Sequence, residues 1–564
     1  MTALGAHKHS KASAHRRFVA VFLLLGLGLS LSSCRQAHRT HSEGVLVASA
    51  TLTSAWVRNF NPFSPNALWP TRAGIYEPMM IFNTLSGQYV PWLATSYRWI
   101  TEGQEVEFSI RKDVRWNDGA PLSAEDVAFT FKLLKQHPAL DTNGVWSRLE
   151  SCRTTGPGVV RFKLKNLDYT ALSVLAHQMV VPKHVWAHVE EPDQFINPTP
   201  VASGPYTEVK TFRTQLFELG LNPHYWQDTK TMPKTLRMPA YAGNDTVSLA
   251  LISGDIDWAG HAIPRIEKTY VNRDPKHFQY WFPPLGGMVF LYANTTTAPL
   301  GKVAVRRALS HAIDRERIVR IGMSGYTKGA DASGLSPTYQ HWKCCDESAQ
   351  AGVRFDRARA AELLSAAGCT QDQKGQWSCD EQPLEFQLDV VNGWTDWIRT
   401  AQLIKQDLKA LGVRVKVKTL DYGAWFGRLQ RGEFELAIGW STEDVSPHAF
   451  YRQLASSETV KPRGEVSPTN WHRYGDDDFD ALLKAFPAEQ KETRRRDIVN
   501  RLQTLFIERM PAIPLFPNPS WGTYSTRYVD GFPNAKKPYA KLSPHADPER
   551  LLLMTNLRVR EALQ

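Results

Sequence analysis

The chain has 564 residues, of which 42% are hydrophobic, and a formal net charge of +11 from 67 Lys and Arg against 56 Asp and Glu. This composition is typical of a globular protein, and because a single core stops growing at roughly 250–300 residues, it predicts at least two lobes. Basic residues do not gather into a stretch with interleaved aromatic residues, so a nucleic-acid partner is excluded.

Residues 1–33 have the pattern of an export signal. Four cations between Lys8 and Arg17 precede an apolar run at 18–31, and no acidic residue occurs before Cys34. The run matches a secretory apolar region of about 7–15 residues and is shorter than the roughly 20 residues of a membrane span. We therefore exclude residues 1–33 from the fold, which leaves a mature chain with a charge of +7 (four cations fewer than +11).

The end of this signal, Leu31-Ser32-Ser33-Cys34, resembles a bacterial lipobox. In that motif a Cys after two small residues carries diacylglycerol. We expect lipid on Cys34, residues 34–44 as a tether, and an extracytoplasmic protein attached to the membrane by this anchor.

Five further cysteines belong to the mature chain: Cys152, Cys344, Cys345, Cys369 and Cys379. Outside the cytoplasm disulfides are stable, and Cys369 and Cys379 flank a polar, Gly-containing stretch typical of a hairpin loop, so we expect a local bridge there. Adjacent cysteines pair only with strain, which leaves a bridge from one of Cys344 and Cys345 to Cys152 as an alternative, with one thiol left over. No His stands at zinc-ligand spacing near these cysteines, and we expect neither a metal nor a cofactor.

Several segments in the first two thirds of the chain predict regular structure. Residues 106–110 alternate as a strand, and Ser123-Ala-Glu-Asp126 resembles a capping box that opens a helix through Leu134. Apolar residues on one face predict a helix around 299–321, and Asp356 is expected to cap a helix over 358–367.

The stretch 394–440 alternates between helix and strand patterns, which is typical of α/β units on a sheet. The expected elements are a helix over 395–411 ended by Gly412, a strand over 413–417, a helix over 423–430 and a strand over 434–440. A last helix is expected near 494–510, and the segment from Pro514 onward is expected to pack back on the first lobe.

Motifs for catalysis are missing from the sequence. Neither a His-Glu-x-x-His zinc-protease motif, a Gly-x-Ser-x-Gly elbow nor a phosphate-binding Gly-x-x-x-x-Gly-Lys-Ser/Thr loop occurs. We therefore expect a protein that is not an enzyme. A hydrolase with distant paired carboxylates and a sensory receptor remain the less favoured alternatives.

Six stretches in order resemble the family 5 bacterial extracellular solute-binding proteins, whose best-known members bind oligopeptides and dipeptides for ABC importers. The resemblance runs from about Val45 to the C-terminal region and is carried by residues 108–127, 203–206, 222–226, 251–257, 305–314 and 361–368.

The resemblance implies an α/β fold, the large two-lobed clam of periplasmic binding proteins, with an extra subdomain in the first lobe. We expect lobe I from 45–83, 203–285 and 515–564, the subdomain from 84–202 and lobe II from 286–514. It also implies a monomer that binds its ligand in the cleft between the lobes and delivers it to an ABC permease.

Two ligand classes follow from this resemblance. In peptide-binding relatives, an Asp three residues after a Trp holds the peptide α-amine; here Trp440-Ser-Thr-Glu443 places Glu at that position, followed by Asp444. A solvated acid on a loop, or a helix cap near Pro447, is the alternative for Glu443.

A second pattern is similar to the oligosaccharide-binding branch of the family. It is carried by Asn392-Gly-Trp394-Thr-Asp-Trp397 and by the stretch that begins at Tyr76. Aromatic rings stack on sugar faces, although core packing is the commoner role of any single Trp. A short peptide and an oligosaccharide such as a cello-oligomer therefore both remain candidate ligands.

Overall fold

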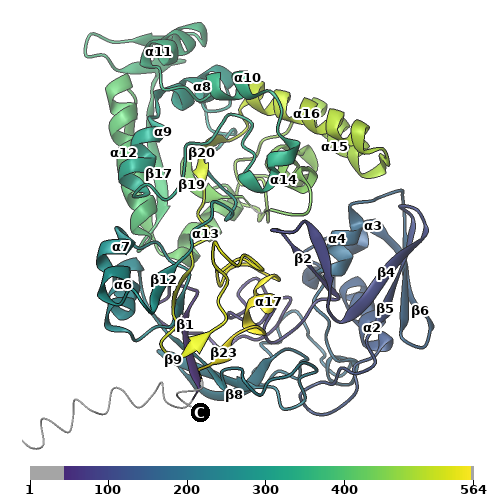
Figure 1. Ribbon diagram of the computed structural model, residues 1–564. Helices are drawn as coiled ribbons and strands as arrows, with labels where there is room; N and C mark the ends of the chain where they lie inside the picture. The colour runs from purple at the N-terminus through teal and green to yellow at the C-terminus, as the bar shows by residue number, and fades with distance from the viewer. Residues whose placement is uncertain (1–43, 442, 561–564) are drawn as a thin grey trace, which may run out of the picture.

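The computed structural model of the chain describes residues 44–441 and 443–560, and two central β-sheets define its two lobes (Figure 1). The lobe I sheet has seven strands in the order β12-β21-β11-β1-β10-β9-β8. Its central strand β1 pairs in parallel with β10 and β11, and the outer pairs are antiparallel. The strands come from three distant parts of the chain: β1 (Val45–Ser49), β8 (Tyr206–Arg213), β9 (Leu216–Leu221), β10 (Thr235–Pro239), β11 (Trp258–Ala259), β12 (Phe278–Tyr280) and β21 (Thr523–Ser525).

The lobe II sheet has five strands in the order β18-β17-β19-β13-β20. Strand β17 runs parallel to β18 and β19, whereas β13 runs antiparallel to β19 and β20. All six residues of β13 are buried, as expected for the middle of a covered sheet. The strands are β13 (Met288–Ala293), β17 (Glu385–Val391), β18 (Arg414–Leu420), β19 (Leu436–Trp440) and β20 (Ile513–Pro517).

A third, smaller sheet lies at the side of lobe I, on the right in Figure 1. It consists of the antiparallel strands β4 (Ala94–Thr101), β5 (Glu105–Ile110), β7 (Val159–Leu164) and β6 (Leu149–Gly156). Helix α2 (Ala124–Gln136) packs on it and begins with the predicted capping box: Glu125 N donates to Ser123 Oγ over 3.2 Å, and Ser123 N donates to Asp126 Oδ2 over 2.8 Å. The buried side chains of this sheet join those of lobe I in one continuous core.

Two chain segments connect the lobes, one between β12 and β13 and one between β20 and β21. They hydrogen-bond to each other: Gly286 N donates to Asn518 O over 2.9 Å, and Asn518 N donates to Gly287 O over 2.8 Å. A side chain at Gly286 would meet the backbone of Pro519 at 2.8 Å, so glycine permits this close approach. The expected boundary after residue 514 falls inside β20, and the chain crosses to lobe I after Pro517.

The C-terminal segment returns to lobe I, as the sequence predicts. It adds β21 to the lobe I sheet, and Trp258 Nε1 donates to Leu542 O over 2.8 Å. A short helix, α17 (Arg550–Met554), follows, so the predicted helix near 494–510, which is α16 (Glu492–Arg509), is not the last helix of the chain.

Most elements predicted in lobe II are confirmed within a few residues. They are α11 (Arg357–Ala366), α12 (Thr395–Leu411), α13 (Tyr422–Arg431) and the strands β18 and β19. The single helix expected around 299–321 is wrong, because the chain forms α8 (Val303–Ala312), α9 (Arg315–Arg317) and a short π-helical segment at 318–322. Asp314 causes the break, since its Oδ1 accepts from Arg317 N over 2.9 Å and starts a new helix.

The cysteines pair within lobe II. Cys369 and Cys379 form a disulfide between β14 (Cys369–Gln371) and β15 (Trp377–Cys379), and Cys344 is joined to its neighbour Cys345. The alternative bridge to Cys152 is wrong, because Cys152 is a free thiol on β6 of the subdomain, packed against the core of lobe I.

The expected signal peptide, Cys34 and nearly all of the expected tether lie outside the described residues. Among the helices of the described part, none combines the length and the apolar character needed to cross a bilayer.

Candidate functional site: a cavity between the lobes

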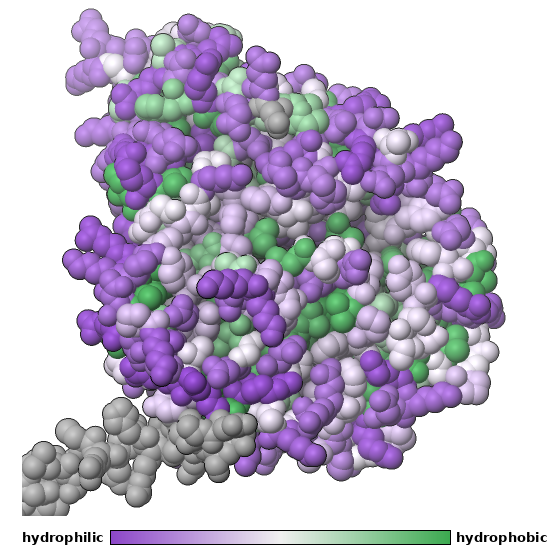
Figure 2. Space-filling view, in the orientation of Figure 1, coloured by the Kyte–Doolittle hydropathy of each residue, from purple (hydrophilic) through white to green (hydrophobic). Residues whose placement is uncertain are grey.

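A cavity of about 520 Å³ lies between the two lobes. This volume falls in the range of about 300–1,000 Å³ that is usual for small-molecule sites. Figure 2 shows pale and apolar residues gathered in a band between the upper and lower halves of the molecule, with hydrophilic residues at the outer edges. The lining comes from lobe I, lobe II and both connecting segments: residues 50–52, 244, 260–262, 285–287, 394, 396, 397, 422, 440, 441, 443, 518–521, 541, 543 and 545–547.

Strand direction explains why these residues meet. In lobe II, the parallel strands β17, β18 and β19 all end at the cavity. The start of α12 follows β17, the start of α13 follows β18, and Trp440 is the last residue of β19. In lobe I, the parallel strands β1 and β11 end at residues 50–52 and 260–262. Ligands of open α/β sheets bind at the carboxyl ends of parallel strands, and here two such ends face each other.

The lobe II wall of the cavity is aromatic. Trp394, Trp397, Tyr422 and Trp440 line it, and the rings of Tyr422 and Trp440 are nearly parallel, 4° apart with centroids separated by 6.5 Å. Trp394 and Trp397 meet edge to face at 4.8 Å. Together these rings form a broad apolar platform for a flat or apolar group.

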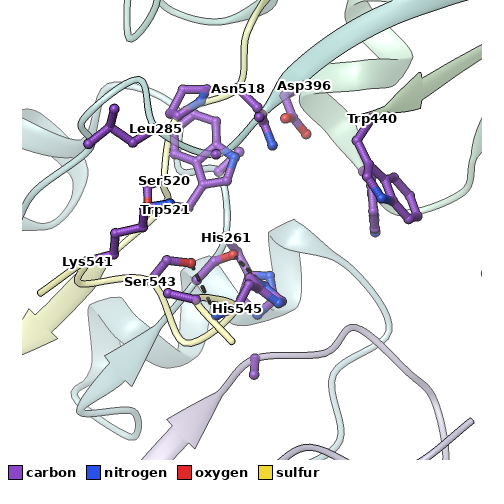
Figure 3. Close-up of a pocket in the computed structure, with 18 of the residues that line it drawn as sticks. His261, Leu285, Asp396, Trp440, Asn518, Ser520, Trp521, Lys541, Ser543 and His545 are labelled. Atoms are coloured by element: carbon purple, nitrogen blue, oxygen red, sulfur yellow. Dashed lines mark hydrogen bonds between the residues drawn. The ribbon is translucent and has the colours of Figure 1, made fainter. Parts of the chain in front are cut away.

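The lobe I wall is more polar. Lys541, Ser543 and His545 lie opposite Trp440 in Figure 3, together with Trp521 of the segment that connects β20 and β21. His261 also lines the cavity, with its Nε2 3.0 Å from Ser49 Oγ, and burial lowers its pKa to about 3. His261 is therefore a neutral ring at physiological pH.

Glu443 is the buried acid of the cavity. Its carboxylate accepts hydrogen bonds from Ser336 and from Thr338 Oγ1, the latter over 2.8 Å. Lys541 Nζ lies 4.0 Å from Glu443 Oε2, and the two side chains are only 12% and 9% exposed. Burial raises the pKa of Glu443, whereas Lys541 and the two hydroxyls oppose that shift.

A second acid, Asp396, sits in the first turn of α12, where it touches lobe I. Its Oδ1 accepts from Asn244 Nδ2 over 3.2 Å, and Asn244 N donates to Gly393 O over 3.1 Å. Asp396 is 5% exposed, and burial raises the pKa of its carboxyl. The lobes thus touch directly at this edge of the cavity.

The ligand-binding residues predicted from the sequence do not all lie in the same place. Trp394, Trp397, Trp440 and Glu443 line the cavity together. Asp444 faces a separate cavity of about 190 Å³ between the subdomain and lobe II, where its Oδ2 accepts from Ser173 Oγ over 3.3 Å.

The remaining two proposed residues, Tyr76 and Asn392, line neither of these cavities. Tyr76 is fully buried in the core of lobe I, where its hydroxyl accepts from Asn197 Nδ2 over 2.7 Å. Asn392 is exposed after β17 and bonds through its backbone to Leu420 O. A shared sequence pattern with other proteins does not reveal which side of the chain each residue presents.

Sequence reasoning missed the lobe I half of the lining. Lys541, His261 and Asn244 of lobe I and Trp521 of the connecting segment belong to no motif, and only the folded chain brings them to one cavity. Asp396 lies within the stretch 392–397, and an acid in the first turn of the predicted helix could have pointed to it. Within the described residues, no three His, Cys, Asp or Glu side chains are grouped to hold a metal ion.

Comparison with known proteins agrees with this architecture. The model of the bacterial extracellular solute-binding proteins, family 5, matches residues 88–462. The peptide transport periplasmic protein SapA of Salmonella typhimurium is 24% identical over 492 residues, covering 82% of this chain and 85% of that protein.

Two solved structures share the fold. The mannohexaose-bound periplasmic oligopeptide-binding protein of Thermotoga maritima aligns with a TM-score of 0.83 and 24% identity, covering 92% of this chain and 99% of that one. The binding protein DppA of Helicobacter pylori with the peptide STSA aligns with a TM-score of 0.75 and 19% identity, covering 92% and 98%. The expected two-lobed fold is confirmed, and the relatives are binding proteins rather than enzymes. This chain belongs to the bacterial extracellular solute-binding proteins of family 5.

Proposed function

We propose that this protein captures a short peptide in the interlobe cavity and delivers it to the permease of an ABC importer. The observation that carries the proposal is Glu443, a buried carboxylate that lines the cavity and has one cation 4.0 Å away. A buried carboxylate is stabilised by a directly bonded cation, and the ammonium group of a peptide supplies one. The names of relatives such as SapA and DppA support the same ligand class.

An oligosaccharide is the second candidate, and a specific observation favours it. The platform of Trp394, Trp397, Tyr422 and Trp440 offers ring faces that suit neutral sugars. The binding of mannohexaose by a relative with the same fold supports this alternative.

A ligand screen separates the two candidates. We would purify the protein, identify co-purifying ligands by mass spectrometry, and then titrate di- and tripeptides and cello- and manno-oligosaccharides by calorimetry. Saturable binding of peptides with a free amine supports the proposal, whereas binding of sugars alone selects the alternative. Failure of both classes to bind would reject both.

We further propose that the protein is exported as a lipoprotein held to the membrane through Cys34. The proposal rests on the lipobox-like residues 31–34 after an apolar run. Metabolic labelling with a fatty acid tests it: the wild-type chain is expected to take up label and fractionate with membranes. A Cys34→Ala chain that is labelled equally would contradict the anchor.

A further inference from the structure

Lys541 belongs to lobe I, although its ammonium group points toward lobe II. Its backbone N donates to Glu549 Oε1 over 3.2 Å, and the carbonyl of the next residue, Leu542, accepts from Trp258 Nε1 of the lobe I sheet. Glu549 is itself buried and accepts a second hydrogen bond from Thr84. The stem of Lys541 is therefore fixed to lobe I, and only its side chain reaches across the cavity.

Glu443, by contrast, is fixed to lobe II. Ser336 and Thr338 hold its carboxylate, and Tyr339 holds the following residue, since its hydroxyl accepts from Asp444 N over 2.8 Å and donates to Asp444 O over 2.9 Å. The Lys541–Glu443 pair is thus a contact between lobes, and any opening of the cleft pulls its two members apart.

Lys541 and Glu443 attract each other electrostatically but do not form a direct hydrogen bond. The separation of 4.0 Å is an ion-pair distance and exceeds that of a hydrogen bond. Both side chains are largely buried, so water screens their attraction less than it would at the surface. A cation that donates directly to Glu443 at hydrogen-bond distance would bind it more tightly than Lys541 does.

From this arrangement we propose that Lys541 is an internal counter-ion of Glu443. It neutralises the carboxylate when no ligand is bound, and the ammonium group of the ligand must displace it. This inference rests on the proposed function for the identity of the ligand, and it adds a determinant of affinity in the lobe opposite Glu443. The Lys541–Glu443 pair favours contact between the lobes and keeps the buried carboxylate neutralised. The free energy that a ligand gains at Glu443 is therefore only the difference between the energy of its own ion pair and that of the Lys541–Glu443 pair.

The competition has a measurable size. The apparent affinity for the peptide equals the intrinsic affinity multiplied by the fraction of molecules in which Glu443 is free of Lys541. If the Lys541–Glu443 pair is formed about nine-tenths of the time, the affinity is therefore about tenfold lower. A neutral sugar does not compete for Glu443 and is not expected to show this effect.

The test compares Lys541→Gln, Lys541→Arg and, as a matched control, Lys536→Gln, whose lysine is exposed on the same C-terminal segment. We would measure peptide affinity by calorimetry, and the radius of gyration of the peptide-free protein by small-angle X-ray scattering. Lys541→Gln is expected to bind a free-amine peptide about tenfold more tightly and to be more open without it. Lys541→Arg keeps the cation and is expected to stay near the wild type in both measurements, as is Lys536→Gln.

Three results would overturn the counter-ion. They are unchanged or weaker peptide binding by Lys541→Gln, an unchanged radius of gyration in that variant, or equal effects of the glutamine and arginine replacements. If the wild-type protein binds no peptide at all, the proposed function fails, and the scattering comparison alone decides whether Lys541 holds the lobes together.

Discussion

Asn244 of lobe I donates a hydrogen bond from Nδ2 to Oδ1 of Asp396 in lobe II across 3.2 Å. The pair lies at one edge of the cavity, and a backbone bond from Asn244 N to Gly393 O stands beside it. Asp396 is buried, and the consequent rise in its pKa shows that its charge is poorly solvated when the lobes meet. When the lobes close, Asn244 therefore supplies the buried carboxylate of Asp396 with a hydrogen-bond donor.

Replacing Asn244 by Ala is expected to weaken closure. The loss of a donor to a buried carboxylate costs about 1–3 kcal/mol, so ligand affinity should fall by roughly 5- to 150-fold. Calorimetry with the best ligand of the screen and small-angle scattering of the free protein would measure both effects. Asp245→Ala, at the exposed neighbour, is the matched control. Equal affinity and scattering in Asn244→Ala and the control would show that this contact does not hold the lobes.

Glu443→Gln tests the proposed ammonium site. The amide keeps the size of the side chain and its bonding to Ser336 and Thr338 but loses the charge, so affinity for a free-amine peptide should fall by about 10- to 100-fold. Binding of the N-acetylated peptide and of neutral sugars should change little. Glu458→Gln, at an exposed acid of lobe II, controls for the loss of one negative charge. Equal peptide affinity in Glu443→Gln would reject the ammonium site.

Tyr422→Ala tests the aromatic platform. Tyr422 lines the cavity and is 43% exposed, so its truncation should cost less stability than that of the buried tryptophans behind it. A sugar that stacks on the ring is expected to lose about 2- to 12-fold in affinity, in line with roughly 0.5–1.5 kcal/mol for ring contacts beyond area burial. Tyr422→Phe keeps the ring and should bind as the wild type does. A ligand whose affinity is the same for both variants does not use this ring.

The lobe II half of the site could be predicted from sequence because its signals are local. The strand pattern at 434–440 and the helix pattern at 395–411 each lie in one short stretch of sequence, and the structure has β19 and α12 there. Once those elements and their parallel pairing are expected, residues at the carboxyl ends of the strands are expected to meet.

The lobe I half could not be predicted, for a physical reason. Lys541 reaches the cavity because a segment after Pro517 crosses back to lobe I and is held there by Trp258, which is almost 300 residues earlier in the chain. Such contacts depend on tertiary pairing, which no local pattern encodes. The position of Tyr76 could not be predicted for the same reason. Its hydroxyl accepts a hydrogen bond from Asn197 in the core, and its ring does not line the cavity.

The Cys369–Cys379 disulfide is expected to stabilise lobe II. It closes a loop of about ten residues, for which the lost entropy of the unfolded chain corresponds to about 2–3 kcal/mol. The Cys369→Ala, Cys379→Ala double variant should unfold at lower urea concentration under oxidising conditions. Under reducing conditions its midpoint should approach that of the wild type. Cys152→Ala, at the free thiol, controls for the loss of cysteine. Equal midpoints for the double variant and the wild type under oxidising conditions would contradict a stabilising bridge.

Glu77 gives the protein a pH-dependent stability that is separate from binding. Its side chain is fully buried in lobe I, where Trp92 Nε1 and Tyr225 OH donate to Oε1 over 2.7 and 3.0 Å. Burial raises its pKa from 4.5 to about 7, so the folded protein holds this proton more tightly than the unfolded chain does. Its contribution to the free energy of unfolding is therefore complete below pH 4.5, falls as the pH rises toward 7, and is constant above that.

Glu77→Gln is expected to remove this pH dependence. The amide retains an acceptor for Trp92 and Tyr225 and cannot ionise, so the loss of stability between pH 4.5 and 8 should be smaller than in the wild type by about 3 kcal/mol. Urea denaturation at the two pH values measures the difference, and comparing the change within each protein cancels any constant cost of the substitution. Glu190→Gln, at an exposed acid of the same lobe, should behave as the wild type does. If Glu77→Gln loses as much stability as the wild type over this range, the buried carboxyl does not titrate there, and its hydrogen bonds hold it ionised throughout.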